Sequence, residues 1–369
     1  MIITFIIFYQ LKRLIKINIT IGGRFKMKLK GLTTMILACA LLVTGCASKA
    51  NKTEDTSKGG DTASSVSYPI TIKHAYGETV IKEEPKNVVA ISWGNPDTPL
   101  ALGVVPAGIS KANYGKITEK GLLPWTDKKF TDLGVDKPVV FDDVDGLDYE
   151  AISNANPDVI LAAYSGLTQE EYDMLSKIAP VVAYPKLAWQ TYWRDQITTN
   201  ATAMGKKDEG TKLVSELDKL IADKTAEYPS IKGKKVAFCY FSPTDLSKFY
   251  IYTSTDPRAA FLNDLGLVEA DSVKELAKSS DSFALTISSE NIDKLADVEV
   301  IVAYGNAELL KQLQADKLLG TLPAIKNGSV ALIDETSDLA AAATPSALSI
   351  PATIDEYLKL IGEAADKVK

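Results

Sequence analysis

The chain has 369 residues, of which 46% are apolar and 24% are charged, and its mean hydropathy is close to zero. This length exceeds what one ordinary hydrophobic core supports, so we expect two soluble domains. Residues 1–45 hold seven Lys or Arg and no Asp or Glu, so the remainder carries 34 basic against 47 acidic residues. This acidic balance argues against nucleic acid as a partner.

The N-terminal residues 1–45 are typical of an export signal. Two lysines precede a short apolar run at 35–43, which is too brief to span a membrane as a helix. The run leads into Val-Thr-Gly before Cys46, a pattern that resembles a bacterial lipobox. We therefore expect cleavage before Cys46 and diacylation of its thiol, because two acyl chains give stable anchoring. An ordinary secretory signal followed by a coincidental cysteine is the alternative.

Two neighbouring segments need separate interpretations. Residues 1–26 are a second basic, apolar stretch ahead of a complete signal, and one hypothesis is that they are an untranslated upstream extension and that translation starts at Met27. Residues 46–67 are polar and poor in side chains that could pack, which predicts a flexible tether behind the lipid. Cys239 is then the one thiol left in the folded part, so no disulfide is expected.

From residue 68 onward, short apolar runs alternate with helical patterns, which is typical of parallel sheets built from strand–helix–strand units. We expect an α/β fold with two similar lobes, at 68–188 and 229–369, and a ligand cleft between them. A hairpin is expected ahead of the first strand, at 73–81. The runs that we interpret as strands are Val88–Ser92, Val159–Ala163, Val181–Tyr184, Val236–Phe241, Val300–Ala303 and Val330–Ile333.

The two halves also repeat weakly. Each places a strand, a helix that ends in Leu-Gly, a short helix opened by Glu and another strand in the same order. Any two α/β halves share part of this order, so chance is the alternative. If the repeat is real, the lobes are alike in fold and face each other.

The segment 189–228 between the lobes has apolar residues at helical spacing, including Trp193, Ile197 and Leu217. No turn signal longer than Gly205-Lys206 interrupts the pattern. We therefore expect one long or slightly broken helix, which at roughly 35 residues would be about 50 Å long and would brace both lobes.

Aromatic residues follow the predicted strands. In open parallel sheets the ligand binds beyond the carboxyl ends of the strands, and there this chain places Trp93, Tyr164, Tyr184, Tyr240, Phe241 and Tyr304. Such rings often only close off a core, but together they predict a cleft for a bulky, partly polar small molecule. Two further ligand-binding candidates in the second half are Tyr252 and Arg258.

The cluster of Trp189, Trp193 and Arg194 lies at the start of the predicted interlobe helix, where we expect the mouth of the cleft. A guanidinium offers five donors in a planar fork to an anionic oxygen ligand and stacks on indole rings, which makes Arg194 the first candidate for ligand binding. A salt bridge with Asp195 or another acid is the alternative.

The motifs that the sequence lacks argue against catalysis. His74 is the only histidine, so neither a histidine-rich metal site nor a Ser-His-Asp triad can form. No glycine-rich phosphate loop is present, and no motif selects a carboxylate pair. We therefore expect a binding protein that is not an enzyme and has no cofactor. Glu150 and Glu290 each open a short helix, where capping explains them, but their equivalent places suit one contact per lobe to a two-fold partner.

From His74 to the C-terminus, the sequence resembles the iron-siderophore substrate-binding lipoproteins of ABC importers. The stretches that carry the resemblance, in this order behind the lipobox, are His74–Thr79, Pro85–Gly94, Ala101–Ile109, Asp148–Ile152, Asn156–Ile160, Tyr192–Gln196 and Ser346–Pro351. The resemblance implies two α/β lobes joined by a backbone helix, with a shallow cleft between them that binds a ferric siderophore. It also implies that Glu150 and Glu290 dock to arginines of a dimeric permease. In hydroxamate-binding relatives an arginine and aromatics near the linking helix hold the ligand, which favours Trp189, Trp193 and Arg194.

We therefore expect a monomeric receptor, anchored by lipid to the extracytoplasmic face of the cell membrane. A ferric siderophore saturates its own metal, so the protein needs aromatic surface and a cation and no metal ligands. Cobalamin or haem bound by the same fold is the first alternative. A lipid-anchored envelope enzyme is the second, and import of a free transition metal is the third.

Overall fold

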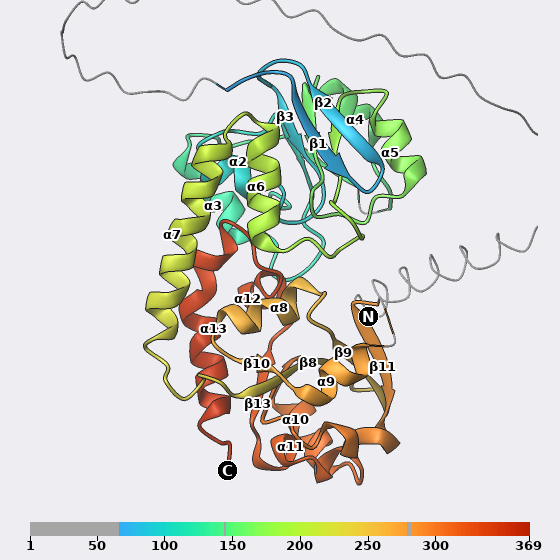
Figure 1. Cartoon of the computed structure of the whole chain (residues 1–369), viewed down its shortest axis with the longest axis vertical. Helices are drawn as coiled ribbons and strands as arrows, with labels where there is room; N and C mark the ends of the chain where they lie inside the picture. The colour runs from blue at the N-terminus through green and yellow to red at the C-terminus, as the bar shows by residue number, and fades with distance from the viewer. Residues whose placement is uncertain (1–65, 144, 279, 281) are drawn as a thin grey trace, which may run out of the picture. The chain divides into compact units, whose positions relative to one another are not determined.

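The computed structural model describes residues 66–143, 145–278, 280 and 282–369. The expected export signal, the lipidation site at Cys46 and nearly all of the tether lie outside these residues. The described part belongs to one compact unit and has two α/β lobes (Figure 1), which confirms the predicted fold class. Among the described helices, none combines the length and the apolar character that crossing a bilayer requires.

The N-terminal lobe is built on a parallel sheet in the order β5-β4-β3-β6-β7. Its strands are β3 (Val88–Ala90), β4 (Gly108–Ser110), β5 (Val140–Phe141), β6 (Val159–Leu161) and β7 (Val181–Val182). Its helices are α2 (Asp97–Ala101), α3 (Pro124–Asp132), α4 (Tyr149–Asn154) and α5 (Gln169–Leu175). Every residue of β3 and β6 is buried, because separate apolar clusters cover the two faces of the sheet.

An antiparallel hairpin precedes this sheet, as the sequence predicts. It consists of β1 (Ile70–His74) and β2 (Gly77–Ile81). The hairpin is attached to the lobe through Thr79, whose hydroxyl donates a hydrogen bond of 2.5 Å to the carbonyl of Val181. His74 binds the same hydroxyl at 2.9 Å and is buried, so it has a structural partner within the hairpin.

The C-terminal lobe has a mixed sheet in the order β11-β9-β8-β12-β13, with β10 paired to β8. Its strands are β8 (Lys235–Ser242), β9 (Asp245–Tyr252), β10 (Val268–Glu269), β11 (Ala284–Ser288), β12 (Val300–Tyr304) and β13 (Val330–Ile333). Its helices are α8 (Pro257–Asp264), α9 (Asp271–Ala277), α10 (Ala307–Ala315), α11 (Pro323–Asn327), α12 (Asp338–Ala342), α13 (Ser349–Ala365) and the 3₁₀ helices η1 (Ser289–Leu295) and η2 (Leu319–Thr321).

The two sheets share part of their topology. In the first lobe β3, β6 and β7 lie side by side and parallel, and in the second lobe β8, β12 and β13 do the same. The sheets differ on the other side of the central strand, where the first has two parallel strands and the second has the antiparallel strands β9 and β11. The predicted repeat therefore describes the shared half of each sheet.

The expected single helix, long or slightly broken, across 189–228 is wrong. The structure has two helices there, α6 (Trp193–Ala203) and α7 (Lys207–Thr225), and α7 runs back alongside α6 (Figure 1). Gly205, with a φ of 71°, follows α6 in the left-handed conformation that glycine favours, and the chain reverses there. A Cβ on Gly210 would lie 2.4 Å from the Cβ of Ala201, so glycine allows the two helices to pack closely. Helical spacing is the same in one helix as in two, so it cannot reveal the reversal.

Helix α6 connects the hydrophobic cores of the two lobes. Trp193 and Ile197 pack in the core of the C-terminal lobe. At the other end of the helix, Ala203 and the adjoining Met204 pack in the core of the N-terminal lobe. The interlobe brace is therefore a short helix with one end in each core.

Candidate functional site

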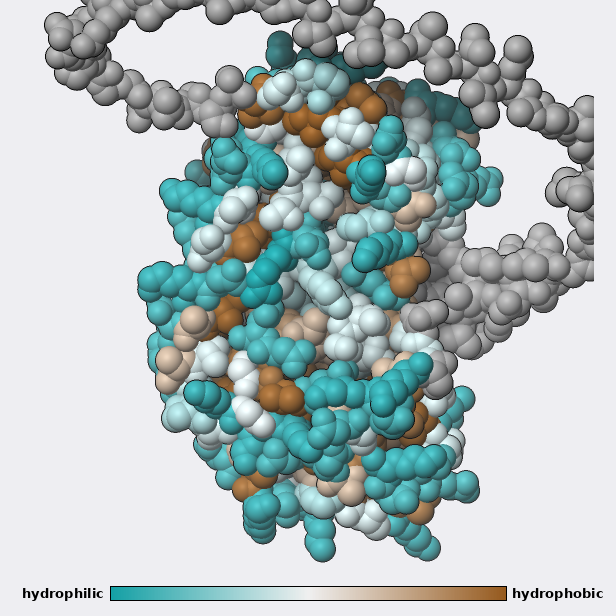
Figure 2. All heavy atoms as spheres, viewed as in Figure 1, coloured by the Kyte–Doolittle hydropathy of each residue, from teal (hydrophilic) through white to brown (hydrophobic). Residues whose placement is uncertain are grey.

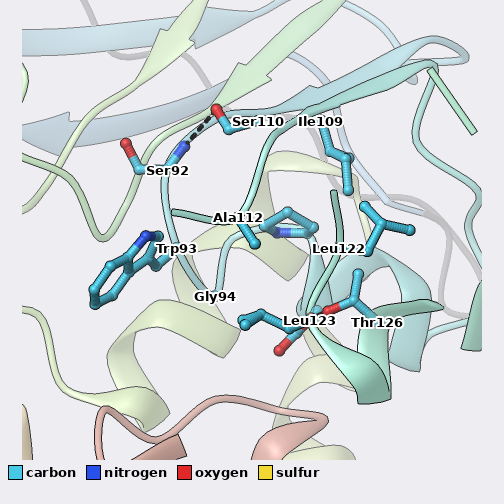
Figure 3. A pocket seen from close by; sticks show the side chains of 11 residues that line it. Ser92, Trp93, Gly94, Ile109, Ser110, Ala112, Leu122, Leu123 and Thr126 are labelled. Carbon is cyan, nitrogen blue, oxygen red and sulfur yellow. Dashed lines mark hydrogen bonds between the residues drawn. The ribbon is translucent and has the colours of Figure 1, made fainter. Parts of the chain in front are cut away.

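The chain turns sharply after β3 and presents Trp93. Ser92 and Gly94 on either side of it have φ of 63° and 68°. The Ser92 amide donates a 3.0 Å hydrogen bond to the hydroxyl of Ser110 (Figure 3), and a Cβ on Gly94 would lie 2.7 Å from Nε2 of Gln196. Non-glycine residues at positive φ persist where the surroundings hold them, and they are frequent at ligand sites. The strained turn therefore fixes the place from which the indole projects.

The Trp93 indole is linked to a ring of the other lobe through Tyr114. Its Nε1 donates to Oδ1 of Asn113 at 2.6 Å, and its ring stacks on Tyr114 with centroids 5.6 Å apart and planes at 13°. The Tyr114 ring in turn meets Tyr304 of β12 edge-on, with centroids 5.8 Å apart. The Tyr114 hydroxyl is buried without a hydrogen-bond partner, and burial raises its pKa. A buried hydroxyl without a partner is a group that a ligand oxygen could satisfy.

A partly buried arginine lies against the C-terminal side of these rings. Arg258 at the start of α8 pairs with Asp256 through two bonds, from Nε to Oδ1 at 2.8 Å and from Nη2 to Oδ2 at 2.6 Å. The guanidinium carbon lies 3.9 Å from the centroid of the Tyr252 ring, the geometry of a cation–π contact. Burial raises the pKa of Tyr304 to about 12, although the neighbouring Arg258 favours the phenolate. The guanidinium is thus fixed among phenol rings by one carboxylate.

A second indole approaches from the N-terminal lobe. The Trp189 ring meets Tyr164 edge-on with centroids 5.4 Å apart, and Trp189 has a φ of 63°. A Cβ on Gly166 would lie 2.3 Å from Nε1 of Trp189, so only glycine leaves room for the indole. The Asn95 side chain accepts a hydrogen bond of 3.1 Å from the backbone amide of Tyr164 and donates one of 2.8 Å to its backbone carbonyl. Burial and the Asp256 carboxylate raise the pKa of Tyr164.

These residues form two contacting groups that share a small pocket, and we call them together the ring cluster. Its members are Trp93, Tyr114, Tyr164, Trp189, Tyr252, Arg258 and Tyr304. A pocket of ≈ 10 Å³ lies where Trp93 and Tyr164 face the segment 341–346 of the C-terminal lobe. A second pocket, of ≈ 30 Å³, lies behind Trp93 against Leu122 and Thr126 (Figure 3). Each has room for about one or two waters, so the rings are closely packed in this conformation.

A buried carboxylate ties the lobes together beneath the ring cluster. Asp97 of α2 accepts hydrogen bonds of 2.9 Å from Nε1 of Trp125 and from the hydroxyl of Thr126. The hydroxyl of Ser346, between α12 and α13, donates to the same carboxylate. Burial raises the pKa of Asp97 to about 6, although these three hydrogen bonds favour the charged form. The pair of Asp97 and Ser346 is a polar contact between N-terminal and C-terminal segments.

Comparison with known proteins identifies the family. The family model described as periplasmic binding protein matches residues 88–336, which span both lobes and the whole ring cluster. The chain belongs to the periplasmic binding protein family. It is 30% identical to the probable siderophore-binding lipoprotein YfiY of Bacillus subtilis, over 72% of this chain and 80% of that protein. It is 27% identical to the Fe(3+)-citrate-binding protein YfmC of the same organism, over 83% of this chain and 89% of that protein.

Solved structures of periplasmic binding proteins show the same fold. The crystal structure of PiaA from Streptococcus pneumoniae TIGR4 in complex with ferrichrome is 51% identical, with a TM-score of 0.78. The match covers 81% of this chain and 100% of that chain. SirA of Staphylococcus aureus, complexed with staphyloferrin B, is 26% identical with a TM-score of 0.59, over 81% of this chain and 98% of that chain.

Within this periplasmic binding protein, the structure brings most of the predicted ligand residues together. The ring cluster contains Trp93, Tyr164, Trp189, Tyr252, Arg258 and Tyr304. Tyr240 lies further along β8, with its ring 6.1 Å from that of Tyr250, and burial raises its pKa to about 12. The ring neighbour of Tyr240 is therefore Tyr250, which is not a member of the ring cluster.

Trp193 and Arg194 are not part of the ring cluster. The Arg194 guanidinium lies between two carboxylates, with Nη2 2.6 Å from Oδ1 of Asp218 and Nη1 2.9 Å from Oδ2 of Asp264. The Trp193 indole is buried and donates from Nε1 to Asp264 at 2.9 Å. The structure thus favours the salt-bridge alternative for Arg194, with acids from α7 and α8 in place of Asp195. These side chains join α6, α7 and α8 to one another.

Sequence reasoning missed Tyr114. This residue follows β4, whose sequence Gly-Ile-Ser contains one large apolar residue and so lacks the apolar run that reveals β3 and β6. Had β4 been recognised, the rule that ligands bind beyond strand ends would have drawn attention to the loop after it.

Glu150 and Glu290 are both exposed, in the first turns of α4 and η1, where a partner can reach them. Over the described residues no group of three or more His, Cys, Asp or Glu is arranged to hold a metal ion.

Proposed function

We propose that this chain is the receptor of an ABC importer and that it binds a ferric siderophore at the ring cluster. The observation that carries the proposal is the ring cluster itself, which combines aromatic rings of both lobes with one partly buried arginine. Such a group suits a bulky ligand with an apolar surface and oxygen acceptors. The 51% identity to PiaA, which was solved with ferrichrome, supports the same ligand class.

The charges at the ring cluster favour a ferric hydroxamate of low net charge. Arg258 is paired with Asp256, whose side chain is 2% exposed, so this pair adds no net charge. Lys116 in the loop that carries Tyr114 lies 3.3 Å from Asp338 and is likewise paired. A polyanionic catecholate or citrate complex needs cations that are free to bind it. A neutral complex needs only donors such as the Tyr114 hydroxyl and the arginine.

A fluorescence titration tests the proposal. Ferrichrome, ferric enterobactin, ferric citrate, haem and cobalamin are added separately to the full-length protein in detergent, and indole emission from Trp93 and Trp189 is followed. We expect saturable quenching by ferrichrome with an affinity at least about tenfold tighter than for the other four. Gallium-substituted ferrichrome, which does not quench through iron, serves as the control and should compete. Saturable binding of haem or cobalamin, without a response to any ferric complex, would overturn the proposal.

We further propose that Cys46 carries the lipid that anchors the protein on the extracytoplasmic face of the membrane. The lipobox-like sequence before Cys46 and the polar tether after it support this, and YfiY is named as a lipoprotein. Metabolic labelling with an alkyne fatty acid tests it. Label should appear in the parent chain and disappear in Cys46→Ser, with Cys239→Ser as the matched control. Undiminished labelling of Cys46→Ser would exclude this anchor.

Glu150 and Glu290 are proposed as the contacts to the permease dimer. Both side chains are exposed on opposite lobes, and neither belongs to the ring cluster. The double variant Glu150→Ala/Glu290→Ala should bind ferrichrome normally and fail to support uptake of ⁵⁵Fe-ferrichrome by cells. The pair Glu170→Ala/Glu308→Ala, also exposed and at the starts of α5 and α10, is the control. Normal uptake by the first pair would refute the assignment.

A further inference from the structure

One loop of the N-terminal lobe reaches across to the C-terminal lobe over the ring cluster. Residues 112–121 follow β4, and their two ends meet where the Ala112 amide donates to the carbonyl of Gly121 at 2.8 Å. Just beyond the ends, the Lys111 amide donates a hydrogen bond of 3.0 Å to the carbonyl of Phe141 in β5, and Leu122 is buried in the core of the N-terminal lobe. The loop is thus anchored at its base, and we call residues 112–121 the strap.

Three consecutive residues of the strap contact the other lobe. Tyr114 places its ring edge-on against Tyr304. A Cβ on Gly115 would lie 3.0 Å from the Cβ of Ala341 in α12, so the strap backbone rests directly on this helix. Lys116 pairs with Asp338, also of α12.

These contacts of the strap are weak compared with the contacts that hold the two lobes together. The side chain of Lys116 is 61% exposed, and exposed ion pairs contribute little to stability. The Tyr114 hydroxyl is buried without a partner, which works against the docked position. By contrast, α6 has one end in each core, and the Asp97 carboxylate is fully buried against Ser346. The strap should therefore release before the lobes separate.

With the strap docked, the two pockets beside Trp93 are too small for a large ligand. Tyr114 lies between Trp93 and Tyr304, with ring centroids 5.6 Å and 5.8 Å from its own. The adjoining pockets measure ≈ 30 Å³ and ≈ 10 Å³, whereas pockets for small molecules span roughly 300–1,000 Å³. Gly115 and Gly121, with φ of 75° and 77°, give the strap two flexible points in the backbone.

We propose that the strap is a lid, which docks Tyr114, Gly115 and Lys116 on the C-terminal lobe and must lift before a ferric siderophore reaches the ring cluster. The inference rests on the proposed function for the identity of the ligand. Binding has a conformational cost, because only protein molecules with the strap lifted can bind the ligand. Weakening its docking should therefore raise the association rate.

A disulfide that closes the lid tests the proposal. Gly115→Cys/Ala341→Cys places the two Cβ atoms 3.0 Å apart, so an outward shift of the strap by about 0.5 Å brings them into the 3.5–4.5 Å range typical of disulfides. Peptide mapping confirms the bridge. In the full-length protein, the oxidised form should bind ferrichrome at least about tenfold more slowly than the same sample after reduction. Equal association rates before and after reduction would overturn the lid. The single variants Gly115→Cys and Ala341→Cys control for each substitution.

A second pair of variants avoids the strained glycine position. Lys116→Gln removes the ion pair to the C-terminal lobe and should raise the ferrichrome association rate about two- to fivefold, the range of an exposed ion pair. Lys120→Gln is the matched control, because Lys120 lies in the same strap and pairs with Asp127 of its own lobe at 2.8 Å. An equal effect of both substitutions, or none from Lys116→Gln, would contradict the lid.

Hydrogen exchange separates this inference from the proposed function. If the parent chain binds no ferrichrome, the proposed ligand is wrong, and the lid is judged by exchange of the amides of residues 112–121 without ligand. Those amides should exchange at least about tenfold more slowly in the oxidised double-cysteine variant than in the reduced one, because exchange requires opening. Equal exchange in the two forms would reject the lid whatever the ligand is.

Discussion

Nη1 of Arg194 lies 2.9 Å from Oδ2 of Asp264, and this contact ties the first turn of α6 to α8 of the C-terminal lobe. The same guanidinium binds Asp218 of α7 through Nε at 2.9 Å and Nη2 at 2.6 Å, and it lies over the Trp193 ring at 4.2 Å. These contacts raise the pKa of Arg194 against the opposing effect of burial. Arg194 is a brace between helices, with both edges of its guanidinium occupied.

Arg194→Ala should therefore destabilise the protein. We expect the free energy of unfolding to fall by about 1–3 kcal/mol, because Asp264 loses its cation while it stays partly buried. Ferrichrome affinity should change by less than about threefold. Thermal unfolding and fluorescence titration measure the two effects, with Asp195→Ala as the neighbouring control. An unchanged melting temperature together with tenfold weaker binding would restore Arg194 as a ligand residue.

Arg258→Gln should weaken ferrichrome binding by at least about tenfold, equivalent to about 1.4 kcal/mol. The reason is the place of this guanidinium among the rings of Tyr252 and Tyr304. The variant also leaves Asp256 buried without its partner, which costs stability. The double variant Asp256→Asn/Arg258→Gln separates the two effects, since it should recover the melting temperature without recovering affinity. Full recovery of both would show that Arg258 acts only on stability.

Tyr114→Phe should leave the melting temperature unchanged or raise it, because the substitution removes a buried hydroxyl that has no partner in the protein. The gain should not exceed about 1 kcal/mol. Ferrichrome should bind more weakly if this hydroxyl donates to the ligand. Tyr76→Phe is the contrasting control, because its hydroxyl bonds Leu167 and lies 2.6 Å from that of Tyr184. A lower melting temperature for Tyr114→Phe would show that the hydroxyl has a stabilising contact.

The sequence predicts the buried strands better than the edges of the sheets. The strands β3, β6 and β12 are continuous runs of buried apolar residues, most of them β-branched. The missed strand β4 has the sequence Gly-Ile-Ser, with one large apolar residue. In the second lobe, the first half of β9 is mainly polar and largely exposed, and its pairing with β8 depends on the turn between Ser242 and Asp245. Short or partly exposed strands thus depend on neighbours that a local pattern does not contain.

The ligand residues also divide into those that the sequence predicts and those whose roles it cannot decide. Trp93, Tyr164 and Tyr304 were found because each follows or ends a strand, and topology alone brings strand ends together. The roles of Arg194 and Arg258 could not be ranked from the sequence, because the acids of the Arg194 brace lie 24 and 70 residues away along the chain. An arginine beside a tryptophan fits a ligand site and a brace equally well until those partners are known.

The buried carboxylate of Asp97 predicts a pH dependence of stability. Its pKa is raised by burial from 3.8 in the unfolded chain to about 6 in the folded protein. Between these values the folded state holds a proton that the unfolded state releases, so the free energy of unfolding rises as the pH falls through 6 and levels off below about 4. The contribution of Asp97 to this gain is about 3 kcal/mol. It is absent at neutral pH, where the carboxylate is charged in both states.

Urea unfolding of the parent and of Asp97→Asn between pH 7.5 and pH 4.5 measures this contribution. Asparagine keeps the shape of the side chain and does not titrate, so the parent should gain about 2 kcal/mol relative to the variant over this range, and the rest of the gain comes below pH 4.5. Other carboxylates titrate in both proteins and cancel in the difference. Thr98→Val, one residue along α2 and also buried, controls for substitution at this interface and should keep the pH dependence of the parent. Parallel pH profiles for the parent and Asp97→Asn would show that Asp97 is ionised at acidic pH and that Ser346, Trp125 and Thr126 fully offset its burial.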